Sequence, residues 1–159
     1  RQVDKYFSPK KFFMNYDEIR IAGQCGLCRS KGKTSGQLLS DHVSRSIGLI
    51  RKVNPEIAIF VWSDMFDPYG NARDNYYFSA STFKGAWEGL DSSIGIVNWN
   101  FANKTKSVKF LNGRGHKQII AGFYDKADWQ TYLKDFFKAA GELTGSKVDG
   151  IMYTTWRKD

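Results

Sequence analysis

Five short runs of apolar, β-favouring residues constrain the fold of this 159-residue chain more than any other feature of its sequence. The runs are residues 11–16, 57–62, 94–99, 118–124 and 150–154. Each run is almost continuously apolar instead of alternating between apolar and polar residues, which is typical of parallel strands covered by helices. The runs therefore predict a parallel sheet of about five strands.

Helical patterns separate the predicted strands. Residues 36–53 place apolar side chains on one face, and Thr34 with Gln37 forms a candidate capping box at the start of this helix. Residues 129–140 carry a second apolar face, and residues 103–113 are a further helix candidate. An alternation of strands and helices predicts the α/β class, with helices packed on a parallel sheet.

The chain shows no internal boundary, low-complexity tract or repeat, so we expect one domain over residues 1–159. Residues 67–90 form a long segment whose aromatic and glycine residues predict a loop with some helix, of the kind that builds the wall of a site. No apolar run approaches the roughly 18 residues that span a bilayer, so we expect no membrane partner.

The net charge bears on the partner. The chain carries 24 Lys and Arg residues against 16 Asp and Glu, a formal net charge of +8 at pH 7. Such an excess favours a polyanionic partner. No recognition motif accompanies the charge, and most basic residues are scattered singly, as on solvated helix faces. A polyanion or nucleic-acid binder therefore stays a minor alternative.

Acidic and aromatic residues follow the apolar runs at a common position. These ends are Asn15-Tyr16-Asp17-Glu18, Trp62-Ser63-Asp64, Asn98-Trp99-Asn100, Tyr124-Asp125 and Thr154-Thr155-Trp156. In a parallel α/β fold the strand ends share one face, where ligands bind. Carboxylates accept hydroxyl hydrogen bonds and indole faces stack on sugars. Taken singly, each acid fits a helix cap or salt bridge and each Trp a core position, but their agreement favours a carbohydrate site.

This ordered set resembles the C-terminal half of the catalytic barrel of family 20 glycoside hydrolases, the β-N-acetylhexosaminidases and their uncharacterised relatives. The segments Trp62-Ser63-Asp64-Met65-Phe66-Asp67-Pro68 and Met152-Tyr153-Thr154-Thr155-Trp156 look most like the uncharacterised branch. The resemblance implies that the five runs are strands four to eight of a (β/α)8 TIM barrel. Residues 1–159 would then be a single partial barrel domain, a fragment whose first three strands precede Arg1.

The resemblance also implies roles for individual residues. Glu18 would be the general acid/base, Asp17 would orient the 2-acetamido group of the substrate, and Tyr124 would hold its carbonyl oxygen. The acetamido carbonyl would be the nucleophile, so no second carboxylate nucleophile is needed. The remaining substrate-binding candidates are the pocket walls Trp62, Trp99 and Trp156 and the hydroxyl ligands Asp64 and Asp125. Adjacent acids such as Asp17 and Glu18 repel one another, which raises one pKa toward the range of a general acid.

Two features depart from the family pattern. A His and two glycines usually precede the Asp-Glu pair, where this chain has Phe13-Met14-Asn15-Tyr16. The bulk of Tyr16 predicts a narrower site or a redirected Glu18. Arg157-Lys158 stand where the family usually has an acidic residue shortly after the last Trp. Arg20, two residues past Glu18, could pair with Asp17 or a substrate anion, or form a structural salt bridge.

The remaining residues that could bind a metal or react are interpreted as structural. Cys25 and Cys28 form a CxxC, which could be a redox dithiol or half of a metal site, but a pair of loop thiols is favoured. His42 and His116 have no ligand partner at metal spacing. We therefore expect neither a metal nor a cofactor.

The sequence thus predicts a glycoside hydrolase-like protein that hydrolyses a terminal N-acetylhexosamine or related hexoside by acid/base catalysis with substrate assistance. The alternative is a non-catalytic carbohydrate-binding protein on the same scaffold, because a fold does not fix a function. A partial barrel would expose residues 11–16 and 150–154 as open strand edges, so we expect self-association or low stability.

Overall fold

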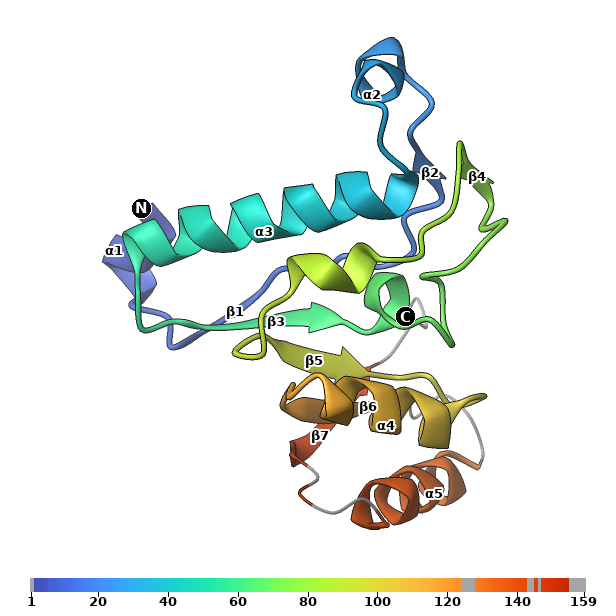
Figure 1. Cartoon of the computed structure of the whole chain (residues 1–159). Helices are drawn as coiled ribbons and strands as arrows, with labels where there is room; N and C mark the ends of the chain where they lie inside the picture. The colour runs from blue at the N-terminus through green and yellow to red at the C-terminus, as the bar shows by residue number, and fades with distance from the viewer. Residues whose placement is uncertain (1, 124–127, 143–144, 146, 155–159) are drawn as a thin grey trace, which may run out of the picture.

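Five parallel strands form one curled sheet in the computed structural model of the chain, which describes residues 2–123, 128–142, 145 and 147–154 (Figure 1). The strands are β1 (Lys11–Phe13), β3 (Ala58–Trp62), β5 (Gly95–Asn98), β6 (Gln118–Phe123) and β7 (Val148–Thr154). Their order in the sheet is β1-β3-β5-β6-β7, and every neighbouring pair is parallel. The sheet curls into a half-barrel, which confirms the predicted α/β class with parallel strands.

Three helices cover the outer face of the curl (Figure 1). They are α3 (Ser35–Val53), α4 (Lys104–Gly113) and α5 (Trp129–Gly141), close to the predicted ranges. The predicted capping box starts α3: Thr34 accepts a hydrogen bond from the Gln37 amide, and the Gln37 side chain accepts one from the Thr34 amide. Apolar side chains of α3 pack on β3 and β5 in the largest core cluster. Helices α4 and α5 bury a second cluster against β6.

Helix α3 approaches a neighbouring loop closely at Gly36. A β-carbon at this position would lie 2.2 Å from the Lys84 carbonyl oxygen and 2.6 Å from that of Phe83. The Gly36 amide donates to the Thr82 carbonyl at 2.9 Å. The loop continues into the short 3-10 helix η2 (Ala86–Gly89), which packs on α3. Only a residue without a side chain permits this contact.

Several short elements were not predicted from the sequence. Helix α1 (Gln2–Phe7) precedes β1, helix α2 (Gly26–Ser30) begins within the CxxC with Cys25 as its N-cap, and the 3-10 helix η1 (Asp64–Phe66) follows β3. Strands β2 (Ile21–Ala22) and β4 (Phe78–Ser79) pair in parallel as a separate two-stranded sheet. Beside the amino-terminal end of α3 in Figure 1, this small sheet joins the segment after Glu18 to the 67–90 segment.

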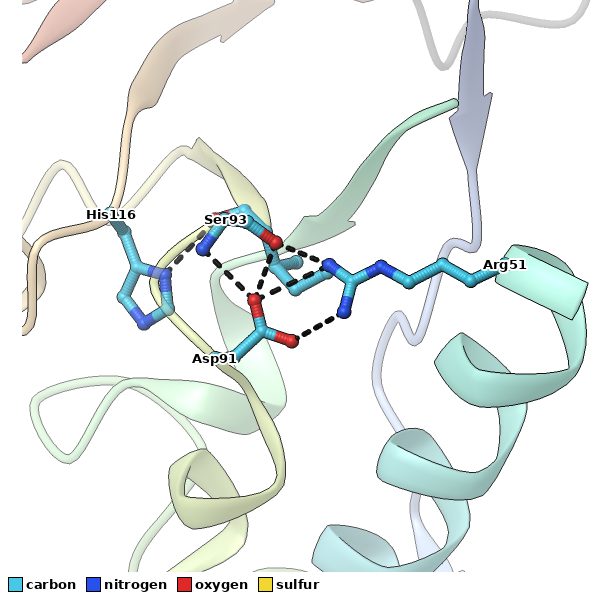
Figure 2. A network of polar contacts seen from close by, with 5 residues as sticks. Arg51, Asp91, Ser93 and His116 are labelled. Carbon is cyan, nitrogen blue, oxygen red and sulfur yellow. Dashed lines mark hydrogen bonds and ion pairs between the residues drawn. The ribbon is translucent and has the colours of Figure 1, made fainter. Parts of the chain in front are cut away.

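A polar network fastens the amino end of β5 to the last turn of α3 (Figure 2). Asp91 accepts a hydrogen bond of 2.8 Å from Arg51 and another from the Ser93 amide at 3.0 Å. The Arg51 guanidinium is the main cause that lowers the pKa of Asp91 to about 2. Buried His116 donates from Nδ1 to the Ile94 carbonyl at 3.0 Å, and burial lowers its pKa. These contacts explain His116 structurally, as predicted.

The half-barrel has two open edges. Strands β1 and β7 each have one strand neighbour in the sheet, and Phe12, Ile151 and Tyr153 are exposed on them. The predicted self-association through these edges stays a prediction. Within the described part of the chain, every helix is too short or too polar to cross a bilayer.

Candidate functional site

The carboxyl ends of three adjacent strands bring together the acids and one indole that the sequence singled out. Asp17 and Glu18 follow β1, Asp64 follows β3, and Trp99 follows β5. The order of these strands in the sheet, β1-β3-β5, makes their ends neighbours. The charges of Asp17 and Glu18 both raise the pKa of Asp64, which shows that the three acids share one electrostatic environment. The predicted convergence of these residues is therefore present in the structure.

Asp64 is the most buried of the three acids. Asp64 begins η1 and is 8 % exposed as a residue, and its Oδ1 accepts a hydrogen bond of 2.7 Å from Nε1 of Trp99. Burial raises the pKa of Asp64 to about 7, although the Trp99 indole acts in the opposite direction. A carboxyl group with this pKa exchanges its proton near neutral pH, as acid/base chemistry requires.

Asp17 lies between Asp64 and Glu18. Burial is the main cause that raises the pKa of Asp17, and the Glu18 charge adds to the shift. Arg20 and a hydrogen-bonding contact with the Asp64 side chain oppose it. The prediction of mutual repulsion between adjacent acids therefore holds for Asp17, but burial has the greater effect, and the sequence could not show it.

Glu18 is exposed and forms an ion pair with Arg20. The Glu18 contact raises the pKa of Arg20. The guanidinium also lies over the Tyr77 ring, 5.1 Å from its centroid. Of the alternatives for Arg20, the structure shows a salt bridge, and its partner is Glu18. Since both side chains are solvated, this pair contributes little to stability and is open to exchange with a ligand.

The backbone around the acids is strained. Asn15, Tyr16 and Glu18 have φ angles of 69°, 67° and 35°, in the left-handed region that L-residues avoid. This turn ends β1 at Phe13, earlier than predicted, although hydrogen bonds from Met14 to Phe60 and from Trp62 to Asn15 continue the pairing. Strain of this kind concentrates at functional sites, where the surrounding structure holds it.

Contacts of Tyr16 hold the strained turn in place. The hydroxyl of Tyr16 lies 3.0 Å from Nδ1 of His42, and its ring packs edge-on against Phe66 at 5.6 Å between centroids. His42 is thus a structural partner of the site segment. The Tyr16 ring packs against His42 of α3 and Phe66 of η1. The predicted narrowing of the site or redirection of Glu18 by Tyr16 stays a prediction.

The strain at Asn15 leads to a stability prediction. We expect Asn15→Ala to destabilise the chain by about 1 kcal/mol relative to Asn15→Gly, since a β-carbon disfavours the left-handed region and Ala lacks the local hydrogen bonding of Asn. The Asn15 side chain is exposed, so neither change removes packing. Thermal melts of both variants measure the difference. Equal melting temperatures would contradict the strain.

Of the three predicted site tryptophans, the two within the described residues, Trp62 and Trp99, are neighbours. Trp62 packs edge-on against Phe13 at 4.9 Å and lies 5.6 Å from Trp99 between ring centroids. Trp62 is only 6 % exposed and joins Val97 and Ala121 in the inner-face core. Trp62 therefore packs in the core beneath Trp99, whereas the half-buried indole of Trp99 is accessible to a ligand.

A pocket of about 320 Å³ opens beside Asp64 and Trp99. Its lining includes Asp67 and Asn100 from the loops after β3 and β5. Asp67 is fully buried and accepts hydrogen bonds from the Asn100 side chain at 2.8 Å and the Tyr69 amide at 2.9 Å. Asp67 was not among the residues predicted to form the site. The turn residues of Asp67-Pro68-Tyr69-Gly70 were the available signal.

Three predicted site residues, Tyr124, Asp125 and Trp156, lie outside the described residues. They follow β6 and β7, the next two strands of the sheet.

The cysteines are free thiols at the start of α2. The Cys25 sulfur accepts a hydrogen bond from the Cys28 amide at 3.3 Å, and the Cys28 side chain lowers the pKa of Cys25. This local capping role agrees with the favoured interpretation as loop thiols. Among the described residues, no group of three or more His, Cys, Asp and Glu side chains is arranged to hold a metal ion.

Fold and site together define a parallel α/β half-barrel with an acidic cluster and a tryptophan at the carboxyl ends of its strands. No protein-family model and no curated protein matches the chain.

Proposed function

We propose that this protein is a glycoside hydrolase-like enzyme that acts on a terminal N-acetylhexosamine or related hexoside. The observation that carries the proposal is the convergence of Asp17, Glu18 and Asp64 at neighbouring strand ends, beside the reachable indole of Trp99. Exposed Glu18 would give its proton to the leaving oxygen, and the 2-acetamido carbonyl would attack the anomeric carbon. Asp17 would hold the acetamido N–H. The curled sheet would be the C-terminal part of a (β/α)8 barrel.

The backbone before the acids supports the resemblance to family 20 glycoside hydrolases. Asn15 and Tyr16 occupy the two positions where that family usually has glycines, and both have φ angles near 70°. Glycine is the residue that adopts this conformation without strain. Asn15 and Tyr16 thus adopt a backbone conformation that glycine favours, at the two positions where the family usually has glycine, and this supports the resemblance.

One observation favours a non-catalytic carbohydrate-binding protein instead. Glu18 is ion-paired with Arg20, and an acid catalyst must carry a proton. A binding protein needs no proton on Glu18 and can use both side chains as ligands for sugar hydroxyls. The two functions therefore differ in turnover and agree in the ligand.

Hydrolysis of a matched panel of aryl glycosides tests the proposal. We expect cleavage of the aryl β-N-acetylglucosaminide or its galacto isomer. Cleavage of the aryl β-glucoside should be at least roughly 100-fold slower, because this substrate lacks the carbonyl nucleophile. A difference in rate of about 100-fold corresponds to roughly 3 kcal/mol in activation free energy. Calorimetric binding of N-acetylglucosamine is measured on the same sample. Binding without cleavage would support the carbohydrate-binding protein. If the folded chain neither binds nor cleaves these sugars, both proposed functions are overturned.

A further inference from the structure

The carboxyl groups of Asp17 and Asp64 interact with each other, and each has one buried oxygen that receives no hydrogen bond within the described residues. These atoms are Oδ1 of Asp17 and Oδ2 of Asp64. The opposite oxygen of Asp64, Oδ1, already accepts from the Trp99 indole. This part of the site therefore has two unsatisfied acceptor oxygens and lacks a hydrogen-bond donor.

Two ionised carboxylates in contact would be unfavourable here. Burial removes the water that would solvate their charges, and the charges repel each other more strongly in a medium of low dielectric constant. A single proton removes both problems, because it neutralises one group and supplies the missing hydrogen bond to the other.

We propose that Asp17 and Asp64 share one proton, which resides on Oδ2 of Asp64 and is donated to the Asp17 carboxylate. Asp64 is then a positioning residue: it fixes the Asp17 side chain through this hydrogen bond. This role differs from the one predicted from sequence, in which Asp64 binds sugar hydroxyls directly.

The surroundings place the proton on Asp64. Its described charged and titratable neighbours are Asp17, Glu18, Arg20, Tyr76 and Asp67. Arg20 is exposed and bound to Glu18, and it favours the ionised form of Asp17. Asp67 already receives its own hydrogen bonds. Asp64 is the more deeply buried of the pair, so it is the better host for the proton.

If the protein is the proposed hydrolase, the shared proton would orient Asp17 toward the substrate; this role rests on the proposed function. An acetamido N–H needs an anionic acceptor held at a fixed angle. A proton donated by Asp64 occupies one Asp17 oxygen and leaves the other to accept from the substrate. Loss of the shared proton above neutral pH would release Asp17, so the proposed activity would fall at alkaline pH.

Tryptophan fluorescence of the full chain tests the shared proton without any substrate. Because Trp99 donates to Asp64, its emission reports the ionisation of that group. We expect a transition centred near pH 7, the value to which burial raises the pKa of Asp64. Asp64→Asn should abolish the transition, and Asp17→Asn should move it to lower pH by removing the neighbouring charge. The control Asp135→Asn changes an exposed carboxylate on α5 and should leave it in place.

Stability against pH gives a second readout. The pKa of Asp64 is higher in the folded chain than in the unfolded one, so the folded state binds the proton more tightly and loses stability as pH rises from about 4 to about 7. Asn imitates the protonated acid: its oxygen accepts from Trp99 and its amide donates to Asp17. We expect Asp64→Asn to melt at the wild-type temperature at pH 5 and at a higher temperature at pH 8.

The shared proton would be overturned by a neutral-pH transition that survives in Asp64→Asn, or by an Asp64→Asn variant that is less stable than wild type at pH 8. A wild-type chain without a transition between pH 5.5 and 8.5 would do the same. None of these measurements involves a sugar. A chain that shows the transition but cleaves no glycoside would keep the proton pair and lose the proposed function.

Discussion

Glu18→Gln should lower kcat for an aryl N-acetylhexosaminide by about 10²–10⁴-fold, the usual contribution of general acid/base catalysis. Gln keeps the size and hydrogen-bonding capacity of Glu but cannot transfer the proton. The loss should be smaller for substrates with strongly acidic phenol leaving groups, because such groups depart with less protonation. Binding of N-acetylglucosamine should persist, so the effect belongs to turnover. Initial rates across a series of leaving groups measure both expectations.

The chain offers a matched control for this change. Glu88 is exposed on η2 and pairs with Arg114 at 3.1 Å, as Glu18 pairs with Arg20. Glu88→Gln therefore removes the same charge from the same kind of ion pair, away from the site, and should leave kcat unchanged. Circular dichroism shows whether both variants fold. Retention of turnover by a folded Glu18→Gln variant, within threefold of wild type, would exclude Glu18 as the acid.

Gly36→Ala and Gly48→Ala should have opposite effects, although both place the same methyl group on helix α3. At Gly36 the new β-carbon would meet two backbone carbonyl oxygens, at 2.2 and 2.6 Å. Backbone cannot move aside as a flexible side chain can, so we expect a loss of about 3 kcal/mol. That loss corresponds to a fall of roughly 10 °C in melting temperature for a chain of this size.

At Gly48 nothing lies within 4 Å of the added carbon. Ala has the higher helix propensity, so Gly48→Ala should stabilise the chain by about 0.5–1 kcal/mol. Urea titration of the three proteins gives the comparison. A Gly36→Ala variant as stable as wild type would mean that α3 and the loop at Lys84 are not in close contact.

The fold was predictable from sequence because its signals are local. Continuous apolar runs identified β3, β5 and β6, and the Thr34 capping box located the start of α3. The small β2–β4 sheet was not predictable in this way. Its strands have two residues each and lie more than 50 positions apart, so neither carries a periodic pattern and only the tertiary structure pairs them.

The sequence predicted which residues converge at the site, but it did not predict their burial or protonation. The strand-end rule brought Asp17, Asp64 and Trp99 together. Burial decides what each does, and burial is a property of the folded chain. Nothing in the sequence distinguishes Trp62, which is enclosed, from Trp99, which is reachable, or shows that Asp64 is more deeply buried than Asp17. Asp67 was missed because its partner Asn100 follows a different strand.

The pairing of β2 with β4 has a mechanical consequence. Phe78 donates to the Arg20 carbonyl at 3.0 Å and Ala80 to that of Ala22 at 2.9 Å, while the Gln24 side chain donates to Phe78. These hydrogen bonds connect the segment with the acids to the segment with Tyr76 and Tyr77. Because hydrogen bonds join the two segments, we expect a displacement of Tyr76 and Tyr77 to be passed on to the segment with Glu18. In the proposed hydrolase, contact of a substrate with the tyrosines and the position of Glu18 would then be coupled.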